Sequence, residues 1–366
     1  MKSYSNLYYK MLEQDAIKRA VKGAAKGKRS RKRVSKYLED IDKTTEQAFY
    51  WIYEYKATYH KPIKIYDGIS RKIRTIIVPS FPELVVQHSV INVLMPIFKK
   101  GMYEHTYASI PGRGAHKAKK YIEKWISSDP KNVKYCLKMD IKHFFESVPH
   151  DILKKKFAKK IRDKQMLNLI YEIIDTGNEG LPLGFYTSQW FANWYLQELD
   201  HYIKEELQAV YYVRYMDDMV IFGPNKRKLH RIREEIEKYL NNNLGLRLKE
   251  NWQVFKFCYT DKTGKHIGRD LDFMGFRFFR DKTILRKSIM IKASRKARRI
   301  EKKEKPTVYE IRQAIAYMGW ISATDTYNYY LKYIKPGVNF KEFKKRISRY
   351  QKRLNREKKK NAMVKT

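Results

Sequence analysis

The residues from Val213 to Phe222 form an apolar, β-prone run that carries two adjacent carboxylates, Asp217 and Asp218, at its centre. An ionised carboxylate in apolar surroundings costs several kcal/mol unless a positive charge meets it. A divalent cation would supply that charge. The alternative is a hairpin whose turn happens to be two Asp residues, because Asp tolerates turn conformations well. This run alone leaves metal chemistry and a plain turn as equal alternatives.

A second apolar run, from Tyr135 to Phe145, is interrupted by a single carboxylate, Asp140. One Asp at the end of a strand and an Asp pair in a neighbouring hairpin can place three carboxylates on one surface. Oxygen ligands of this kind suit Mg²⁺, which binds one or two carboxylates together with waters and substrate phosphates. Two such ions about 3.5–4 Å apart would activate a 3′-hydroxyl and stabilise a leaving pyrophosphate. Together the two runs predict nucleotidyl transfer.

The charge of the chain points to a polyanionic substrate. The 366 residues include 79 Lys and Arg against 39 Asp and Glu, a formal net charge of +40, with basic clusters at 22–36, 286–305 and 341–360. Lys and Arg neutralise phosphates, and interleaved aromatic rings can stack on bases. Any single cluster can also be a solvated helix face or a disordered tail, and we prefer that interpretation for residues 356–366. The charge of the whole chain predicts a nucleic-acid partner.

The order of expected elements predicts an α+β fold in which helices cover one face of an antiparallel sheet. Besides the two carboxylate runs, we expect strands at 61–66, 71–79 and 272–279, the first two joined by a turn at Asp67-Gly68. Helices are expected over 1–50, 84–94 (ending before Pro96), 115–125, 151–174, 186–207, 226–240 and most of 307–350.

Other classes of site find little support. Cys136 and Cys258 have neither metal-ligand spacing nor a disulfide framework, which fits a reducing cytoplasm. No signal peptide and no run of about 18 apolar residues is visible, so we expect a cytoplasmic protein without a membrane span. His143 and His150 flank Asp140, but no Cys or Ser partner suggests a nucleophile, and we expect structural or solvated roles.

From about Lys61 to Tyr350 the motifs resemble those of the reverse transcriptases in order and spacing. The resembling segments are the first carboxylate motif (140–145), the nucleotide-binding loop (181–184), the signature box (215–218), the primer-grip hairpin (272–276) and the start of the thumb helices (316–320). The resemblance implies a right-hand polymerase fold. Its parts would be a basic helical extension (1–55), fingers (56–134), a palm (135–280) with a finger insertion at about 151–185, and a helical thumb with a basic tail (281–366).

The resemblance also implies roles for individual residues. Asp140, Asp217 and Asp218 would be catalytic and hold two Mg²⁺ ions, for which Mn²⁺ can substitute, together with the backbone carbonyl of Ile141. Phe145 would lie under the incoming sugar and exclude a 2′-hydroxyl, with core packing as its alternative. Lys72 and Arg74 would reach the triphosphate, unless they only line an exposed strand face. The remaining assignments are Leu183, Gly184 and Gln189 at the nucleotide, and Phe273, Met274, Gly275 and Phe276 in the primer grip.

Three departures from the commoner family pattern indicate a subgroup. Leu183 stands where many members carry Gln, so we expect reduced fidelity. Ser188-Gln189 replaces the Ser-Pro of retroviral and group II intron enzymes, and Trp252 lies near a position where many relatives keep a Lys as proton donor. These features resemble the diversity-generating retroelement enzymes and the defence-associated, unknown-group bacterial enzymes. The Val-Thr-Gly signature of retron enzymes is missing from the thumb region.

The sequence therefore predicts an RNA-directed DNA polymerase of a diversity-generating retroelement, acting on an RNA template, a DNA or RNA primer and dNTPs. One alternative is an antiviral, phage-defence reverse transcriptase that makes DNA on a dedicated noncoding RNA. Another, from a different class, is a nucleic-acid-binding scaffold without catalytic activity. A dedicated RNA or an accessory protein is left open as a further partner.

Overall fold

A computed structural model describes residues 3–58, 60–66, 73–177 and 179–363, with side chains as far as Glu357. The chain divides into two compact units. The first comprises Met1–Ala118 and Lys131–Phe255, and the second comprises Lys119–Pro130 and Lys256–Thr366. The basic extension at the N-terminus thus belongs to the same unit as both carboxylate runs.

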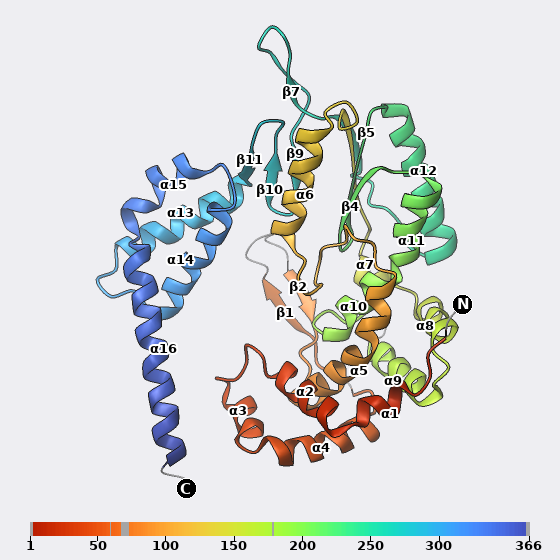
Figure 1. Ribbon diagram of the computed structural model, residues 1–366, viewed down its shortest axis with the longest axis vertical. Helices are drawn as coiled ribbons and strands as arrows, with labels where there is room; N and C mark the ends of the chain where they lie inside the picture. The colour runs from red at the N-terminus through yellow and green to blue at the C-terminus, as the bar shows by residue number, and fades with distance from the viewer. Residues whose placement is uncertain (1–2, 59, 67–72, 178, 364–366) are drawn as a thin grey trace. The chain divides into compact units, whose positions relative to one another are not determined.

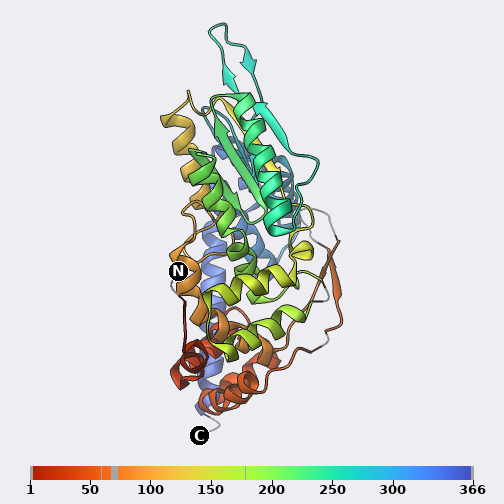
Figure 2. The same ribbon diagram turned by 90° about the vertical axis from the view of Figure 1, so that its right-hand side faces the viewer.

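The centre of the first unit is a four-stranded sheet of order β4-β5-β3-β6, in which β4 and β5 form an antiparallel hairpin. Its strands are β4 (Tyr211–Tyr215), β5 (Asp218–Gly223), β3 (Tyr135–Asp140) and β6 (Gln253–Lys256). The helix α12 (Lys226–Leu244) covers one face of this sheet (Figures 1 and 2). The strands are nearly continuous in apolar residues because most of their side chains are buried. This is the predicted α+β arrangement.

The core of the first unit surrounds α5 (Phe81–Lys100), which begins with a capping box between Ser80 and Glu83. By length and composition alone α5 could cross a membrane, but it is largely buried inside the unit, as core helices of soluble proteins also are. The expectation that this helix ends before Pro96 was wrong. Pro96 is exposed and lies four residues before the end of the helix, which continues to Lys100 without a backbone bond from Pro96 to the carbonyl of Asn92.

The basic extension is helical, as predicted, and packs onto the core. It consists of α1 (Leu7–Leu12), α2 (Gln14–Ala24), α3 (Lys32–Glu39) and α4 (Ile41–Tyr53). Both α2 and α4 contact α5, and α2 buries an apolar stripe while its charged residues remain outside. The next segment is the predicted hairpin of β1 (Ile63–Tyr66) and β2 (Ile73–Ile76), whose expected turn at Asp67-Gly68 lies outside the described residues.

The expectation of one helix over 151–174 was wrong. The structure has α8 (His150–Lys160) and α9 (Lys164–Asp175). Between them, Ile161 forms a parallel bridge with Tyr4, and Asp163 caps α9 by accepting a bond from the amide of Met166. The pairing with a segment near the N-terminus interrupts the helix.

The other helices near the sheet differ from the prediction in their bounds. The predicted helix over 186–207 divides into α10 (Tyr186–Tyr195), α11 (Gln197–His201) and a π-helical turn (Tyr202–Glu206). Short α7 (Phe144–Ser147) follows β3, and α6 (Ala115–Ser128) extends from the first unit into the second.

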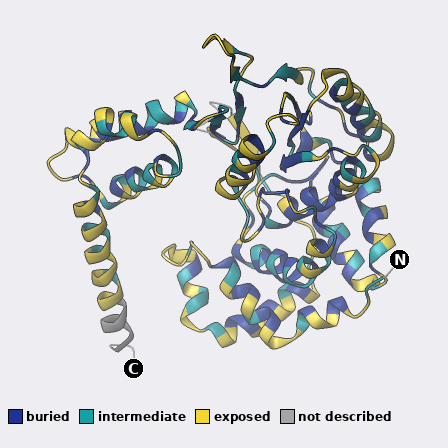
Figure 3. Ribbon diagram, turned by 45° about the horizontal axis from the view of Figure 1, so that its top comes forward, coloured by how far each residue is buried: buried dark blue, intermediate teal, exposed yellow. Residues whose placement is uncertain are grey.

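The second unit combines small sheets with helices. Its strands are β7 (Tyr259–Thr260), β8 (His266–Ile267), β9 (Leu271–Phe273), β10 (Phe276–Phe278) and β11 (Thr283–Leu285). Its helices are α13 (Lys287–Glu301), α14 (Val308–Ile321), α15 (Tyr327–Tyr333), a 3₁₀ turn (Lys335–Gly337) and α16 (Phe340–Met363). Figure 3 shows α16 exposed along most of its described length, so a solvated helix, not a coil, carries the basic C-terminal cluster.

Candidate active site

The two carboxylate runs meet in the sheet. Asp140, the last residue of β3, is directly opposite Asp218, the first residue of β5. Met216 and Asp217 form the two-residue turn between β4 and β5. Met216 has a φ of 60°, in the left-handed region that such hairpin turns require at their first central position. A non-glycine residue held there costs on the order of 1 kcal/mol, so the surrounding structure must fix this turn.

Asp140 and Asp217 lie close enough to interact strongly. Burial raises the pKa of Asp217 to about 7, and the negative charge and hydrogen bond of Asp140 contribute to the same increase. The charge of Asp218 has a smaller effect in the same direction. Two carboxylates this close repel each other when both are ionised. The pair is therefore arranged to gain from a cation.

A second observation supports a cation at this pair. The Oδ1 atom of Asp140 is buried and has no hydrogen-bond partner among the described residues. An unpaired buried acceptor is unfavourable, and a metal ion would satisfy it. Mg²⁺ needs only one or two carboxylates because waters and substrate phosphates complete its shell. Asp140 and Asp217 thus fit such an ion.

The full set of predicted ligands is not assembled. Within the described part of the chain, no three His, Cys, Asp or Glu side chains converge as a group that could hold a metal. The Ile141 amide donates to the carbonyl of Asp217 at 3.3 Å, which ties the end of β3 to the turn. Metal ligation by Asp218 and by the Ile141 carbonyl stays a prediction.

We expect Asp217→Asn to stabilise the metal-free protein clearly more at pH 8 than at pH 5. The folded-state pKa of about 7 lies above the ordinary value of 3.8. The folded state therefore holds the proton more tightly, and its stability falls as the pH rises from about 4 to 7. Asn cannot ionise and avoids this loss. Thermal unfolding in EDTA should show a gain of several degrees at pH 8, at about 2–4 °C per kcal/mol.

The matched control is Asp151→Asn, because Asp151 is exposed and lies in the same unit. We expect the control to change the melting temperature equally at both pH values. A gain for Asp217→Asn that is the same at pH 5 and pH 8 would contradict the assigned carboxylate pair.

Lys249 is a residue at this site that the sequence interpretation missed. Its Nζ atom lies 2.5 Å from Oδ2 of Asp140, and its amide donates to the Asp140 carbonyl at 2.8 Å. The bridge between Ile141 and Leu248 brings it there. Alternating apolar and basic residues from Leu246 to Lys249 indicate an extended segment, but the partner of that segment is a tertiary feature. Trp252 instead packs under the guanidinium of Arg233, 4.5 Å from the ring.

A buried ion pair, also missed, holds the turn between β4 and β5. The side chains of Arg214 and Asp200 are fully buried and lie 2.5 Å apart at Nη2 and Oδ2. Nη1 of Arg214 donates to the Met216 carbonyl at 3.0 Å and to Oδ1 of Asn193 at 3.2 Å. The Tyr212 hydroxyl donates to Asp200 at 2.7 Å. Arg214 therefore fixes the residue immediately before Asp217. An Arg inside a buried apolar run was the available signal, because such a charge must be paired.

The predicted nucleotide-binding loop lies between α7 and the end of β2. The Leu181 amide donates to the Phe145 carbonyl at 2.6 Å, and the Ile77 amide donates to the Leu183 carbonyl at 2.7 Å. Gly184 has a φ of 111°, and a Cβ atom there would come within 2.1 Å of the Ile77 carbonyl oxygen. Only glycine permits this approach. The loop is thus joined to Phe145 on one side and to the β2 segment on the other.

The two histidines near β3 have the structural or solvated roles expected of them. His150 contacts the Gly180 carbonyl through Nε2 at 2.7 Å and so supports the loop, while His143 is exposed and pairs with Glu146. Of the two adjacent rings, Phe144 is buried and Phe145 is half-buried. Phe145 therefore has the exposure that a sugar-contacting residue needs, and its role as a gate stays a prediction.

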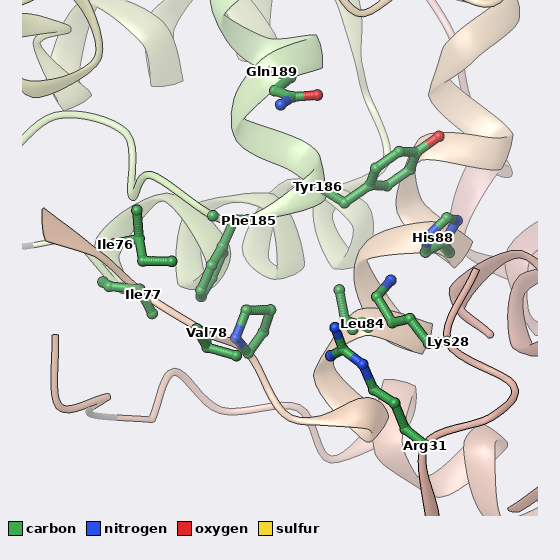
Figure 4. A pocket seen from close by; sticks show the side chains of 12 residues that line it. Lys28, Arg31, Ile76, Ile77, Val78, Leu84, His88, Phe185, Tyr186 and Gln189 are labelled. Atoms are coloured by element: carbon green, nitrogen blue, oxygen red, sulfur yellow. The ribbon is translucent and has the colours of Figure 1, made fainter. Parts of the chain in front are cut away.

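A pocket of about 280 Å³ lies beside this loop (Figure 4). Gly184 and Gln189 line it together with the β2 segment, while Lys28 and Arg31 reach it from the basic extension. His88, which stacks on Tyr186 at 4.0 Å, also lines it. Burial, with a smaller effect of Lys28, lowers the pKa of His88 to about 4, so this ring is neutral at pH 7. The pocket combines two cations with an apolar wall.

The other predicted residues do not line this pocket, and one of them lies outside the described residues. Arg74 is exposed on β2, and Lys72 lies outside the described residues. The four primer-grip residues belong to the second unit, where Phe273 and Phe276 are buried and Met274 and Gly275 form a hairpin turn with positive φ. These roles stay predictions.

Comparison with known proteins gives a family match. The family described as Reverse transcriptase (RNA-dependent DNA polymerase) matches residues 60–278, which include all three carboxylates and more than half of the chain. The retron Ec73 reverse transcriptase of Escherichia coli is 27% identical over 252 residues, covering 63% of this chain and 77% of that protein. Protein YkfC of Escherichia coli K12 is 24% identical over 256 residues, covering 58% and 65%. A solved telomerase of Candida tropicalis in complex with a telomeric RNA fragment is 12% identical with a TM-score of 0.47, covering 79% and 58%.

Proposed function

The chain belongs to the family of reverse transcriptases, the RNA-dependent DNA polymerases, and we propose that it copies RNA into DNA at the carboxylate pair of Asp140 and Asp217. The family match confirms the predicted fold class, an α+β right-hand polymerase fold. The observation that carries the proposal is the meeting of these two carboxyls at the end of β3 and the β4–β5 turn. A raised pKa at Asp217 and an unpaired oxygen at Asp140 accompany it.

In this proposal Asp140 and Asp217 hold Mg²⁺, or Mn²⁺ in its place. Asp218, which is opposite Asp140 on the neighbouring strand, is a further ligand. The bound ions supply charge stabilisation for the attacking 3′-hydroxyl and the leaving pyrophosphate. The residues of the chain provide the geometry. Arg214 fixes the turn, and Lys249 neutralises Asp140 until the ion and the substrate phosphates arrive. The primer would be DNA or RNA, and the nucleotides would be dNTPs.

Nucleotide selection would depend on Phe145 and on the loop bonded to it. The half-buried ring of Phe145 would exclude a 2′-hydroxyl by volume. Leu183 offers an aliphatic side chain where many relatives offer an amide, so it can test the shape of the nascent base pair but cannot hydrogen-bond to it. We therefore propose low-fidelity synthesis within a diversity-generating retroelement.

The fidelity proposal predicts that Leu183→Gln lowers the misincorporation rate about fivefold, since one hydrogen bond contributes on the order of 1 kcal/mol. The measurement is steady-state incorporation of correct and incorrect dNTPs opposite each base of a heteropolymeric RNA. Leu183→Met is the control, because it changes shape but adds no strong hydrogen-bonding group. Equal error rates in all three proteins would remove Leu183 as the cause of low fidelity.

A phage-defence reverse transcriptase that makes DNA on a dedicated noncoding RNA is the second candidate. The retron enzyme among the relatives is the observation that favours it. Sequencing the RNA that copurifies with the protein separates the two candidates. One discrete structured RNA would support the phage-defence enzyme. RNA from the template repeat of a diversifying element would support the diversity-generating retroelement enzyme. The scaffold alternative is disfavoured because a protein without metal chemistry gains nothing from costly buried carboxylates.

A further inference from the structure

A second pocket lies in the first unit, where the end of α5 meets α8 and α11. Its volume is about 460 Å³, and its wall includes Tyr4, Ile97, Lys100, Lys156, Trp194 and Gln197. None of the residues assigned above to metal, nucleotide or primer line this pocket. Its volume is within the range of about 300–1,000 Å³ that holds small-molecule ligands.

The pocket carries an excess of positive charge. Lys100, Lys156 and Lys160 line it against a single acid, Glu198. Lys156 is only 9% exposed and pairs with Glu198 at 2.5 Å, so that acid is already used. Within the described residues, neither Lys100 nor Lys160 has an ion-pair partner. Burial lowers the pKa of Lys156, which Glu198 opposes and the charges of Lys159 and Lys160 reinforce. An anion would relieve this imbalance.

Other walls of the pocket suit a flat heterocycle. Trp194 and Tyr4 both line the pocket; Trp194 is 6% exposed and also packs on Phe157 at 4.5 Å. Tyr4 is held in place by backbone bonds to Lys160 and Arg162, both of 2.9 Å. Aromatic rings bind bases of any sequence by stacking. Tyr4 lies next to Lys160 through this bridge, so a ring and a cation border the pocket together.

The amide of Gln197 supplies a donor and an acceptor in the same wall. A Cβ atom on Gly101 would come within 2.3 Å of Nε2 of Gln197, so glycine at this position leaves room for the amide. The Gly101 carbonyl contacts Nε2 of His201 at 2.8 Å, and Nδ1 of His201 contacts Glu205 at 2.7 Å. His201 is therefore held in place in this wall, beside an amide that can both donate and accept a hydrogen bond.

We propose that this pocket binds a nucleoside phosphate, with the phosphate at Lys100 and Lys160 and the base between Trp194, Tyr4 and Gln197. A carboxylate or an inorganic anion would use the lysines but leave the rings and the amide unused. The ligand can be a free nucleotide or the 5′-phosphorylated end of an RNA, because both present the same chemistry. The site is separate from the carboxylate pair, so this inference goes beyond the proposed polymerase function.

Calorimetric titration with ADP tests the proposal, in EDTA so that no divalent metal ion is bound at the carboxylate site. We expect one ADP to bind the wild-type protein and Lys100→Glu/Lys160→Glu to weaken binding about tenfold or more, because both phosphate-binding charges are reversed. Lys99→Glu/Lys155→Glu is the matched control: it changes the net charge equally at exposed residues of the same two helices that do not line the pocket. The control should bind ADP within about twofold of wild type, as distant surface charges are screened.

Competition identifies the source of the ligand. Displacement of ADP by a 5′-phosphorylated RNA 10-mer, but not by the 5′-hydroxyl form, would identify an RNA end. ADP binding that neither RNA displaces would identify a free nucleotide. Failure of ADP and of the 5′-phosphorylated RNA to bind, or equal weakening in both double variants, would overturn the proposal. Primer extension by the pocket variant should be retained, which separates this test from that of the polymerase function.

Discussion

Asp217→Asn is expected to lower the rate of nucleotide incorporation about a thousandfold or more, in Mg²⁺ and in Mn²⁺. Asn replaces one of the two carboxylates that meet at the end of β3 with a neutral amide. Losing about 4 kcal/mol of charge stabilisation in the transition state corresponds to this factor. Single-turnover incorporation at saturating primer-template and dNTP measures it directly. The substitution is nearly isosteric, so unfolding curves recorded beside it should show a folded protein.

Asp218→Asn is the matched comparison, because Asp218 is the next residue in the same hairpin. It perturbs Asp217 less than Asp140 does, and no group of three potential ligands forms among the described residues. We therefore expect a clearly smaller loss from Asp218→Asn than from Asp217→Asn. Equal losses would favour the three-carboxylate site implied by the family resemblance. A fully active Asp217→Asn protein would place the chemistry elsewhere.

Arg214→Met is expected to destabilise the protein by about 3–5 kcal/mol, because it leaves Asp200 as a buried charge without its partner. Both side chains are fully buried, so water cannot compensate. Urea unfolding at 25 °C measures the change. Arg353→Met is the control, since Arg353 and Glu357 form an exposed helical pair expected to contribute less than about 0.5 kcal/mol.

The double variant Arg214→Met/Asp200→Leu separates stability from positioning. Removing both charges should recover much of the lost stability, because a buried ion pair can often be replaced by apolar residues. The bond from Arg214 to the Met216 carbonyl would still be missing, so incorporation should stay slow and the apparent affinity for Mg²⁺ should be reduced. A double variant with wild-type stability and wild-type incorporation would contradict the positioning role of Arg214.

The residues that the sequence could locate are those encoded by local patterns. Asp140 ends one apolar run and Asp217 interrupts another, and strand geometry alone is enough to bring such positions together. The glycine at 184 was likewise found from a local motif, and its close approach to the Ile77 carbonyl gives the physical reason for it. The α+β fold class followed from the order of the same elements.

The features that the sequence could not locate depend on contacts between distant segments. Lys249 lies beside Asp140 because its neighbour Leu248 forms a β-bridge with Ile141. Arg214 on β4 pairs with Asp200 on α11. The break after α8 has the same origin, because Ile161 pairs with Tyr4. Helical periodicity continues through such positions and carries no signal of the distant partner.

The central claim is RNA-directed DNA synthesis at the carboxylate pair. It is tested most directly by Mg²⁺-dependent extension of an oligo(dT) primer on poly(rA) with dTTP, with wild-type and Asp217→Asn proteins side by side. We expect extension by the wild-type protein that EDTA abolishes, and none above background from the variant. No extension by the folded wild-type protein, or equal extension by both proteins, would contradict the claim.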